Sequence, residues 1–234
     1  MTHSQNPTSQ MPRHPILARY LIDLPAAEIP PGVPPVPELP TPWALVPADC
    51  SSSSSDADLV AEWMQRPHLV ETWEQPWPAA RWREDWEAKL GTPYAIPLIL
   101  HREGTPAGYL EIYRPHLDEI RGVYASKPHD LGFHIAIGDP ESTGRRLFSP
   151  LFGILPELLF AADPECEVLV VEPDYRNERV HRALRREGWV DCGERQQRAD
   201  RRVRLFLWGR TPEALAGRGE PHDDSTAAEP APAP

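Results

Sequence analysis

Apolar positions in the middle of the chain follow two different periods, and the change from one to the other predicts where helices and strands lie. Apolar residues recur every three or four positions in four segments, which predicts helices at 56–65, 79–90, 145–162 and 178–187. β-branched and aromatic residues alternate or run together elsewhere, which predicts strands at 43–47, 94–100, 107–113, 131–137, 168–172, 190–194 and 203–208. The order is strand, two helices, three strands, helix, strand, helix and two strands.

Local signals indicate how these elements join. The sequence Arg102-Glu103-Gly104-Thr105 separates two strands and is favourable for a hairpin, so those strands should be antiparallel. Asn177 is our predicted N-cap for the helix 178–187, and Gly188 is its expected C-terminal glycine. Only connections through a helix can join parallel strands. We therefore predict an α/β fold with a mixed, mostly antiparallel central sheet flanked by helices.

Charge and hydropathy exclude several classes of protein. The 234 residues include 24 basic and 35 acidic side chains, a net charge of −11, so the overall field opposes nucleic-acid binding. Mean hydropathy is −0.50, and no apolar run approaches the roughly 18–20 residues that cross a bilayer. The polar N-terminus lacks a secretory signal pattern, and three isolated cysteines suit a reducing compartment. We expect a cytoplasmic protein with neither nucleic-acid nor membrane partners and no metal.

Proline marks the ends of the domain. Eleven of the 30 prolines precede residue 43, which predicts an extended Pro-rich arm at 1–42. The end of the chain is polar, Pro-rich and nearly devoid of bulky apolar residues, which predicts a disordered tail at 213–234. One domain at 43–212 lies between them, and we assign no chemistry to either end.

Several short blocks, in order along the chain, carry a resemblance to a known family. They are WMQRPHL at 63–69, WE at 73–74, RW at 81–82, GYLEIY at 108–113, DLGFH at 130–134 and EPDYRN at 172–177. Over residues 42–210 the chain resembles the branch of the GNAT acyltransferases that acylates siderophore hydroxylamines. That branch includes aerobactin-type N6-hydroxylysine acetyltransferases and mycobactin-type lysine N-acyltransferases.

The resemblance implies a GNAT fold and an N-acyltransferase. An acyl group would pass from acyl-CoA, first of all acetyl-CoA, or from an acyl carrier protein. The acceptor would be the hydroxylated amine of a lysine-, ornithine- or cadaverine-like compound, and the product a hydroxamate that binds ferric iron. Such an amine is mostly unprotonated near neutral pH, so the protein mainly has to hold both reactants and stabilise the developing oxyanion.

Two residues are the predicted catalytic pair. Alternation along the strand 131–137 places His134 on the face opposite Phe133, and the resemblance implies that it binds or deprotonates the hydroxylamine. Asp174 follows a buried strand at the end where open sheets bind ligands, so it can pair with His134 or the substrate amine. Glu172 is the alternative carboxylate. A structural histidine and a helix-capping aspartate are the competing interpretations.

The donor site is expected on the strand of His134 and the loop after it, where backbone N–H groups at a helix start would hold the CoA pyrophosphate. The predicted donor-binding residues are Ile135, Ala136, Ile137, Gly144, Arg145, Arg146 and Asn177. The chain departs from the family here: one of two usual glycines remains, and Leu184 stands where many members carry a proton-donating tyrosine. The two arginines can pair with phosphate or simply be solvated.

The predicted acceptor-binding residues are Trp73, Glu74, Glu111 and Tyr113. Five of eight tryptophans fall between residues 63 and 86, where an aromatic wall would suit an alkyl chain, although core packing is the alternative. Two other functions stay open: a GNAT enzyme for another amine, such as an aminoglycoside 6'-amino group or a protein N-terminus, and a non-catalytic GNAT-fold binding module. The oligomeric state is not predicted.

Overall fold

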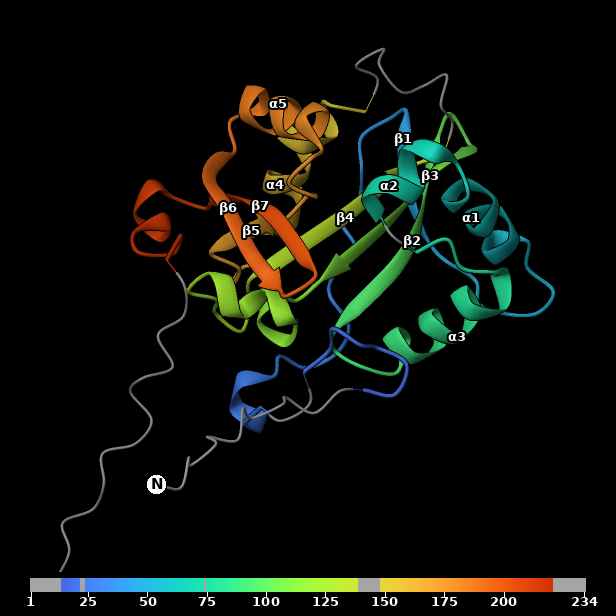
Figure 1. Ribbon diagram of the computed structural model, residues 1–234, viewed down its shortest axis with the longest axis horizontal. Coiled ribbons are helices and arrows are strands. Elements are labelled where there is room, and N and C mark those ends of the chain that lie inside the picture. Colours follow the sequence, from blue (N-terminus) through green and yellow to red (C-terminus); the bar gives the residue numbers. More distant parts are fainter. Residues whose placement is uncertain (1–13, 22–23, 74, 139–147, 221–234) are drawn as a thin grey trace, which may run out of the picture.

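A single seven-stranded sheet organises the protein, in the order β1-β2-β3-β4-β5-β7-β6 (Figure 1). The computed structural model describes residues 14–21, 24–73, 75–138 and 148–220. The helices are α1 (Asp56–Met64), α2 (Pro67–Trp73), α3 (Ala79–Leu90), α4 (Leu151–Ala162) and α5 (Glu178–Glu187). The strands are β1 (Trp43–Pro47), β2 (Ala95–Arg102), β3 (Thr105–Tyr113), β4 (Leu131–Ile137), β5 (Val168–Val171), β6 (Val190–Arg198) and β7 (Arg201–Gly209). The predicted mixed, mostly antiparallel sheet is confirmed.

The first four strands form an antiparallel meander. In the turn between β2 and β3, Glu103 and Gly104 have φ angles of 53° and 78°, the left-handed pair that a tight hairpin needs. The predicted hairpin is therefore confirmed. It fixes the register of β2 on β3, and in the next strand pair Glu111 of β3 lies opposite His134 of β4.

The sheet opens between β4 and β5. These strands are parallel and pair only at Leu131 with Leu169 and at Gly132 with Val170. Beyond that point the described part of β4, from Phe133 to Ile137, has no strand partner on its β5 side. Half of the backbone groups along an extended strand face each side, so this edge presents backbone groups that no strand pairs, although the Ile137 carbonyl lies 3.2 Å from Nε2 of His68.

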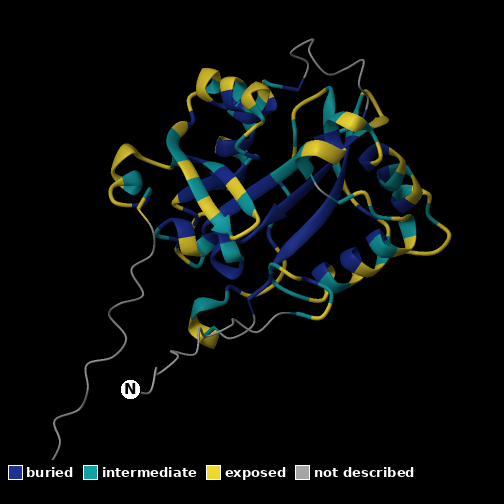
Figure 2. Ribbon diagram, in the orientation of Figure 1, coloured by how far each residue is buried: buried dark blue, intermediate teal, exposed yellow. Residues whose placement is uncertain are grey.

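Helices cover both faces of the sheet. Figure 1 shows α1, α2 and α3 grouped beside β1, β2 and β3, and α4 and α5 grouped beside β5, β6 and β7. Trp82 and Trp86 of α3 are fully buried against Tyr109, whereas Leu155 and Leu159 of α4 pack on the opposite face. Figure 2 shows β2 and β5 mostly buried, whereas edge strand β6 has only half-buried and exposed positions.

The described parts of both chain ends pack on the domain. Leu17 and Tyr20 are buried, and Tyr20 stacks on Tyr94 with ring centroids 5.2 Å apart. Near the other end, Arg218 is buried and its side chain donates to the carbonyl of Ala125. The folded unit is therefore larger than the predicted 43–212, while residues 1–13 and 221–234 lie outside the described part.

The remaining differences from the predicted elements are small. Helix α2 was not predicted, because seven residues beginning at Pro67 give too short a periodic signal, although proline is tolerated in a first helical turn. The predicted helix 145–162 is described from Leu151 onward. The predicted capping of α5 is confirmed: the Asn177 side chain accepts a hydrogen bond from the Val180 N–H, and Gly188 has a φ of 104°.

Candidate active site

His134 lies at the point where β4 leaves β5, and its ring is held between two carboxylates. Its Nε2 is 2.7 Å from Oε1 of Glu172, and its Nδ1 is 3.3 Å from Oε2 of Glu111. The ring of Tyr113 stacks on the imidazole, with centroids 4.5 Å apart and planes within 12°. Strand alternation predicted the face that His134 occupies, and the structure confirms it, since Phe133 packs in the core on the opposite face.

The carboxylate that pairs with His134 is Glu172, the alternative, and not Asp174. Glu172 ends the buried run of β5, and its second oxygen accepts a hydrogen bond of 2.7 Å from the Tyr113 hydroxyl. Asp174 lies past Pro173, where the chain turns toward α5, and its Oδ1 accepts from the backbone N–H and the Nε of Arg176. The predicted pairing of Asp174 with His134 is therefore wrong, although Asp174 lines the same cavity.

Glu111 forms an ion pair with a buried lysine. Lys89 of α3 donates to Glu111 and also lies 2.6 Å from Oδ2 of Asp85. The Tyr109 hydroxyl donates to the same oxygen of Glu111 at 2.5 Å. Glu111, predicted to bind the acceptor, therefore lines the cavity, but its oxygens are already in contact with Lys89, Tyr109 and His134.

The two carboxylates change the proton affinity of His134. Burial alone would lower the pKa of His134, but the negative charge of Glu172 and hydrogen bonds to Glu111 and Glu172 outweigh burial and raise it. Burial alone would raise the pKa of Glu172, yet His134 and Arg19 hold it well below its usual range. Without substrate, the site therefore favours an imidazolium between two ionised carboxylates.

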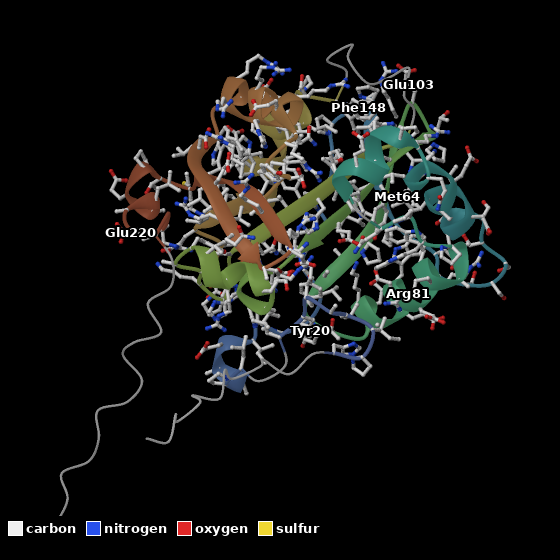
Figure 3. All side chains as sticks on the ribbon, in the orientation of Figure 1. Tyr20, Met64, Arg81, Glu103, Phe148 and Glu220 are labelled. Atoms are coloured by element: carbon white, nitrogen blue, oxygen red, sulfur yellow. The ribbon has the colours of Figure 1, made fainter. Side chains whose placement is uncertain are left out.

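A cavity of about 750 Å³ surrounds His134. It extends from the N-terminal arm and α3, past the imidazole, to the space between α4 and α5. Figure 3 labels Arg81 of α3 and Phe148 just before α4, two lining residues that lie far apart in the molecule. Other lining residues include Leu17, Arg19, His68, Trp73, Trp77, Asp85, Lys89, Glu111, Glu172, Asp174 and Leu184.

The predicted donor-side residues divide into three groups. Ile135, Ile137 and Asn177 line the cavity. The side chain of Ala136 points to the opposite face and packs with the tryptophan cluster of α1 and α3. Gly144, Arg145 and Arg146 lie outside the described residues, as does Glu74 on the acceptor side.

The aromatic residues near His134 have separate roles. Trp73 lines the cavity and presents an edge to the imidazole, with centroids 5.9 Å apart. Tyr113 is fully buried. Its ring stacks on the His134 imidazole and its hydroxyl donates to Glu172, so it supports both residues. Trp63, Trp82 and Trp86 are buried in the core, which was the alternative interpretation of the tryptophan cluster.

Two charged residues of the site were missed from the sequence. Lys89 could have been found, since it lies seven residues after Trp82 and three after Trp86, on the stripe of α3 that is buried. Arg19 could not have been found from the sequence, because it lies in a Pro-rich segment where no hydrophobic period predicts a helix or a strand. Its Nη2 is 2.8 Å from Oε1 of Glu172.

One group of possible metal ligands occurs among the described residues. Ligand atoms of His129, Asp163 and Glu165 lie within 4.8 Å of one another. Arg114 already donates to the Asp163 carboxylate at 3.2 Å, and none of the three lines the cavity around His134. We therefore assign this group no role in the active site. Within the same described ranges, every helix is too short or too polar to span a bilayer.

Comparison with known proteins shows the family of the chain. Residues 52–197 match the family model described as acetyltransferase (GNAT) domain. The chain belongs to the GNAT acetyltransferase family. It is 42% identical over 182 residues to the lysine N-acyltransferase MbtK of Mycobacterium sp. (strain MCS), covering 76% of this chain and 72% of the relative. It is 28% identical to an N-hydroxyputrescine acetyltransferase of Acinetobacter baumannii, covering 60% and 69% of the two chains.

Solved structures agree on the fold. A crystal structure of aminoglycoside acetyltransferase AAC(6')-Ib in complex with coenzyme A matches with a TM-score of 0.62 at 23% identity, covering 74% of this chain and 97% of that one. The curated relatives confirm the predicted GNAT branch and the predicted acyl-CoA-dependent N-acyltransferase. The protein is a GNAT-fold N-acyltransferase of the siderophore-biosynthesis branch.

Proposed function

We propose that the protein transfers an acyl group from a CoA or carrier-protein thioester to the hydroxylated terminal amine of a lysine-like compound. The product is a hydroxamate for siderophore assembly. Acetyl-CoA is the simplest donor, and ornithine- and cadaverine-like amines belong to the same acceptor class. The single observation that carries the proposal is the position of His134: an imidazole between Glu172 and Glu111, inside the cavity, where β4 separates from β5.

The acid–base role of His134 follows from its two contacts. The 2.7 Å contact to Glu172 is the shorter, so in the neutral ring the remaining proton stays on Nε2 and points to that carboxylate. Nδ1 then has a lone pair, and its 3.3 Å contact with Glu111 becomes unfavourable. We infer that the acceptor N–H enters at Nδ1, and that the imidazole takes this proton as the new bond forms.

The transfer itself is an addition followed by an elimination. The acceptor nitrogen attacks the thioester carbonyl carbon, a C–N bond forms, and His134 removes the proton from that nitrogen. The C–S bond then breaks, and the thiolate takes a proton from the imidazolium or from solvent. Leu184, buried in the cavity wall, cannot supply it, which agrees with the departure predicted from the sequence.

The open edge of β4 suits the donor. An extended thioester arm carries amide groups, and these can hydrogen-bond to a strand that lacks a partner. Ile135 and Ile137 face the same cavity, and apolar residues of α4 and α5 continue it past His134. We assign the acyl chain to this side, and we assign the alkyl stem of the acceptor to the side of Trp73 and Trp77.

A comparison of acceptors tests the function. We expect N6-hydroxylysine to be acylated at least about tenfold faster than lysine at pH 7, because the lysine amine, with a pKa near 10.4, is almost wholly protonated. Product formation is followed by mass spectrometry and by the colour of the ferric hydroxamate, with acetyl-CoA, longer acyl-CoAs and an acylated carrier protein as donors. Equal rates for the two acceptors with every donor would contradict the proposal.

A further inference from the structure

Arg19 brings a positive charge from the N-terminal arm to the catalytic pair. Its Nη2 lies 2.8 Å from Oε1 of Glu172, the same oxygen that contacts His134 Nε2 at 2.7 Å. The same Nη2 is 3.1 Å from Oδ1 of Asp118. One carboxylate oxygen of Glu172 is therefore shared between a guanidinium and an imidazole.

The arm holds Arg19 in a fixed place. On either side of it, the Leu21 N–H donates to Leu117 O at 2.9 Å, and the Arg19 carbonyl accepts from the Glu119 N–H at 3.0 Å. Tyr20 stacks on Tyr94 and forms a β-bridge with Asp118. Arg19 is thus held in place by contacts of both its backbone and its side chain.

Asp118 is a prearranged partner for that guanidinium. It is fully buried, and its Oδ1 also accepts from the Ile120 N–H at 2.9 Å. Its other oxygen accepts from the Tyr94 hydroxyl. Asp118 is therefore held by Tyr94 and by the Ile120 N–H independently of Arg19, and it aims Arg19 at Glu172. An arginine in a chance surface ion pair would not have a fully buried and hydrogen-bonded carboxylate as its partner.

We propose that Arg19 is a positioning residue for the acyl transfer. It orients the Glu172 carboxylate toward His134 and limits how strongly that carboxylate holds a proton on the imidazole. This inference rests on the proposed function for its effect on rate, because it assumes that the neutral imidazole is the working base. Its effect on the proton affinity of His134 can be measured without substrate.

The charges around His134 support this role. Glu172 raises the pKa of His134, and Arg19, acting against it, lowers the same pKa. Without Arg19, Glu172 would keep His134 protonated up to a higher pH, so a smaller fraction of the imidazole would be neutral at pH 7. The charged and titratable groups in contact with His134, its carboxylates or Arg19 are Glu111, Tyr109 and Tyr113 of β3, Glu172 after β5, Arg19 of the arm, Asp85 and Lys89 of α3, Tyr94, Asp118 and Glu119. His68 of α2 lines the same cavity.

Three variants test the proposal. Arg19→Met removes the charge but keeps much of the stem, and Arg19→Lys keeps a charge without the planar fork. Arg121→Met is the matched control, since Arg121 lies 4.0 Å from Glu28 of the arm and does not line the cavity. The His134 imidazole is titrated by NMR in each full-length protein, with His134→Gln used to assign its signal. Circular dichroism confirms that each variant folds.

We expect Arg19→Met to raise the pKa of His134, because it removes the positive charge that opposes Glu172. The acid limb of kcat/KM, which reports the free enzyme, should move to higher pH with it, so kcat/KM at pH 7 should fall by up to about tenfold. The KM of the acceptor should change little. Arg19→Lys should restore the titration of His134, and Arg121→Met should leave it where it is in the wild type.

Other outcomes would overturn the proposal. If Arg19→Met folds and leaves the titration of His134 unchanged, Arg19 does not act on the pair. If it raises the acceptor KM while the pH profile stays in place, Arg19 binds substrate instead. If the wild type fails to acylate any hydroxylamine, the proposed function fails, while the NMR titration still decides whether Arg19 controls His134.

Discussion

At the scale of single residues, Lys89 shows how the protein maintains ionised groups in its interior. Its side chain is buried between Asp85 and Glu111, and the Coulomb attraction of both carboxylates offsets the cost of desolvating the ammonium. Burial alone would raise the pKa of Glu111, but Lys89 and His134 lower it. The lysine thus keeps ionised the carboxylate that faces Nδ1 of His134.

Lys89→Met should cost about 3–5 kcal/mol of unfolding free energy at pH 7, because it leaves two buried carboxylates without their cation. Denaturant titration measures the loss. Since the pKa of Glu111 is lowered on folding, its stabilisation is present above its unfolded pKa and is lost as pH falls. The cost of the substitution should therefore shrink in acid.

Arg83→Met on the same helix provides the control. Arg83 pairs with Asp58 at 2.5 Å, but that carboxylate is 64% exposed, so we expect a change within about 1 kcal/mol. Equal losses in the two variants would contradict the buried network.

Residue-level prediction from the sequence reached the histidine, but it named Glu172 only as the alternative carboxylate and Glu111 only as an acceptor-binding residue. The orientation of His134 follows from alternation along a strand, which depends on local sequence alone. Glu172 and Asp174 both lie near the end of β5, and the choice between them depends on Arg176, which satisfies Asp174 through a local turn. The contribution of Arg19 depends on contacts across 153 positions in sequence, which no local pattern reports.

At the scale of elements, the pairing of β3 with β4 positions the residue on which the His134 imidazole stacks. Gly132 of β4 lies opposite Tyr113 of β3. A Cβ at Gly132 would lie 2.5 Å from Cε1 of Tyr113, closer than real Cβ contacts allow. The absent side chain therefore leaves room for the tyrosine ring that stacks on His134 and donates to Glu172.

Gly132→Ala should displace the ring of Tyr113 and lower kcat by about tenfold or more, because small misplacements of catalytic groups are costly. Steady-state kinetics with the hydroxylamine acceptor measures the effect. Gly122→Ala serves as the control, since a Cβ there meets nothing within 4 Å. A Gly132→Ala enzyme that is as active as the control would show that the stack is dispensable.

Element-level prediction was more complete than residue-level prediction. All seven strands were expected, because alternation and apolar runs depend on nearby residues. The opening between β4 and β5 was not derivable from the same patterns, since both strands look equally regular along the chain. It is a property of how the two strands pair in three dimensions, which a local pattern does not report.

At the scale of the whole molecule, residues from distant parts of the chain line one cavity. The arm provides Arg19, α3 provides Lys89, β3 and β4 provide Glu111 and His134, and the end of β5 provides Glu172. In the proposed function, the acceptor and donor sides lie at opposite ends of that cavity, with His134 between them.

The pH dependence of acyl transfer in the wild type and in His134→Gln is the most direct test of the central claim. Because the pKa of His134 is raised, kcat/KM of the wild type should fall as pH drops through a midpoint above about 6.5, the unperturbed value. His134→Gln should lose about two orders of magnitude of activity, together with that limb of the profile. A folded His134→Gln enzyme with wild-type rates and the same limb would contradict the assignment of His134 as the base.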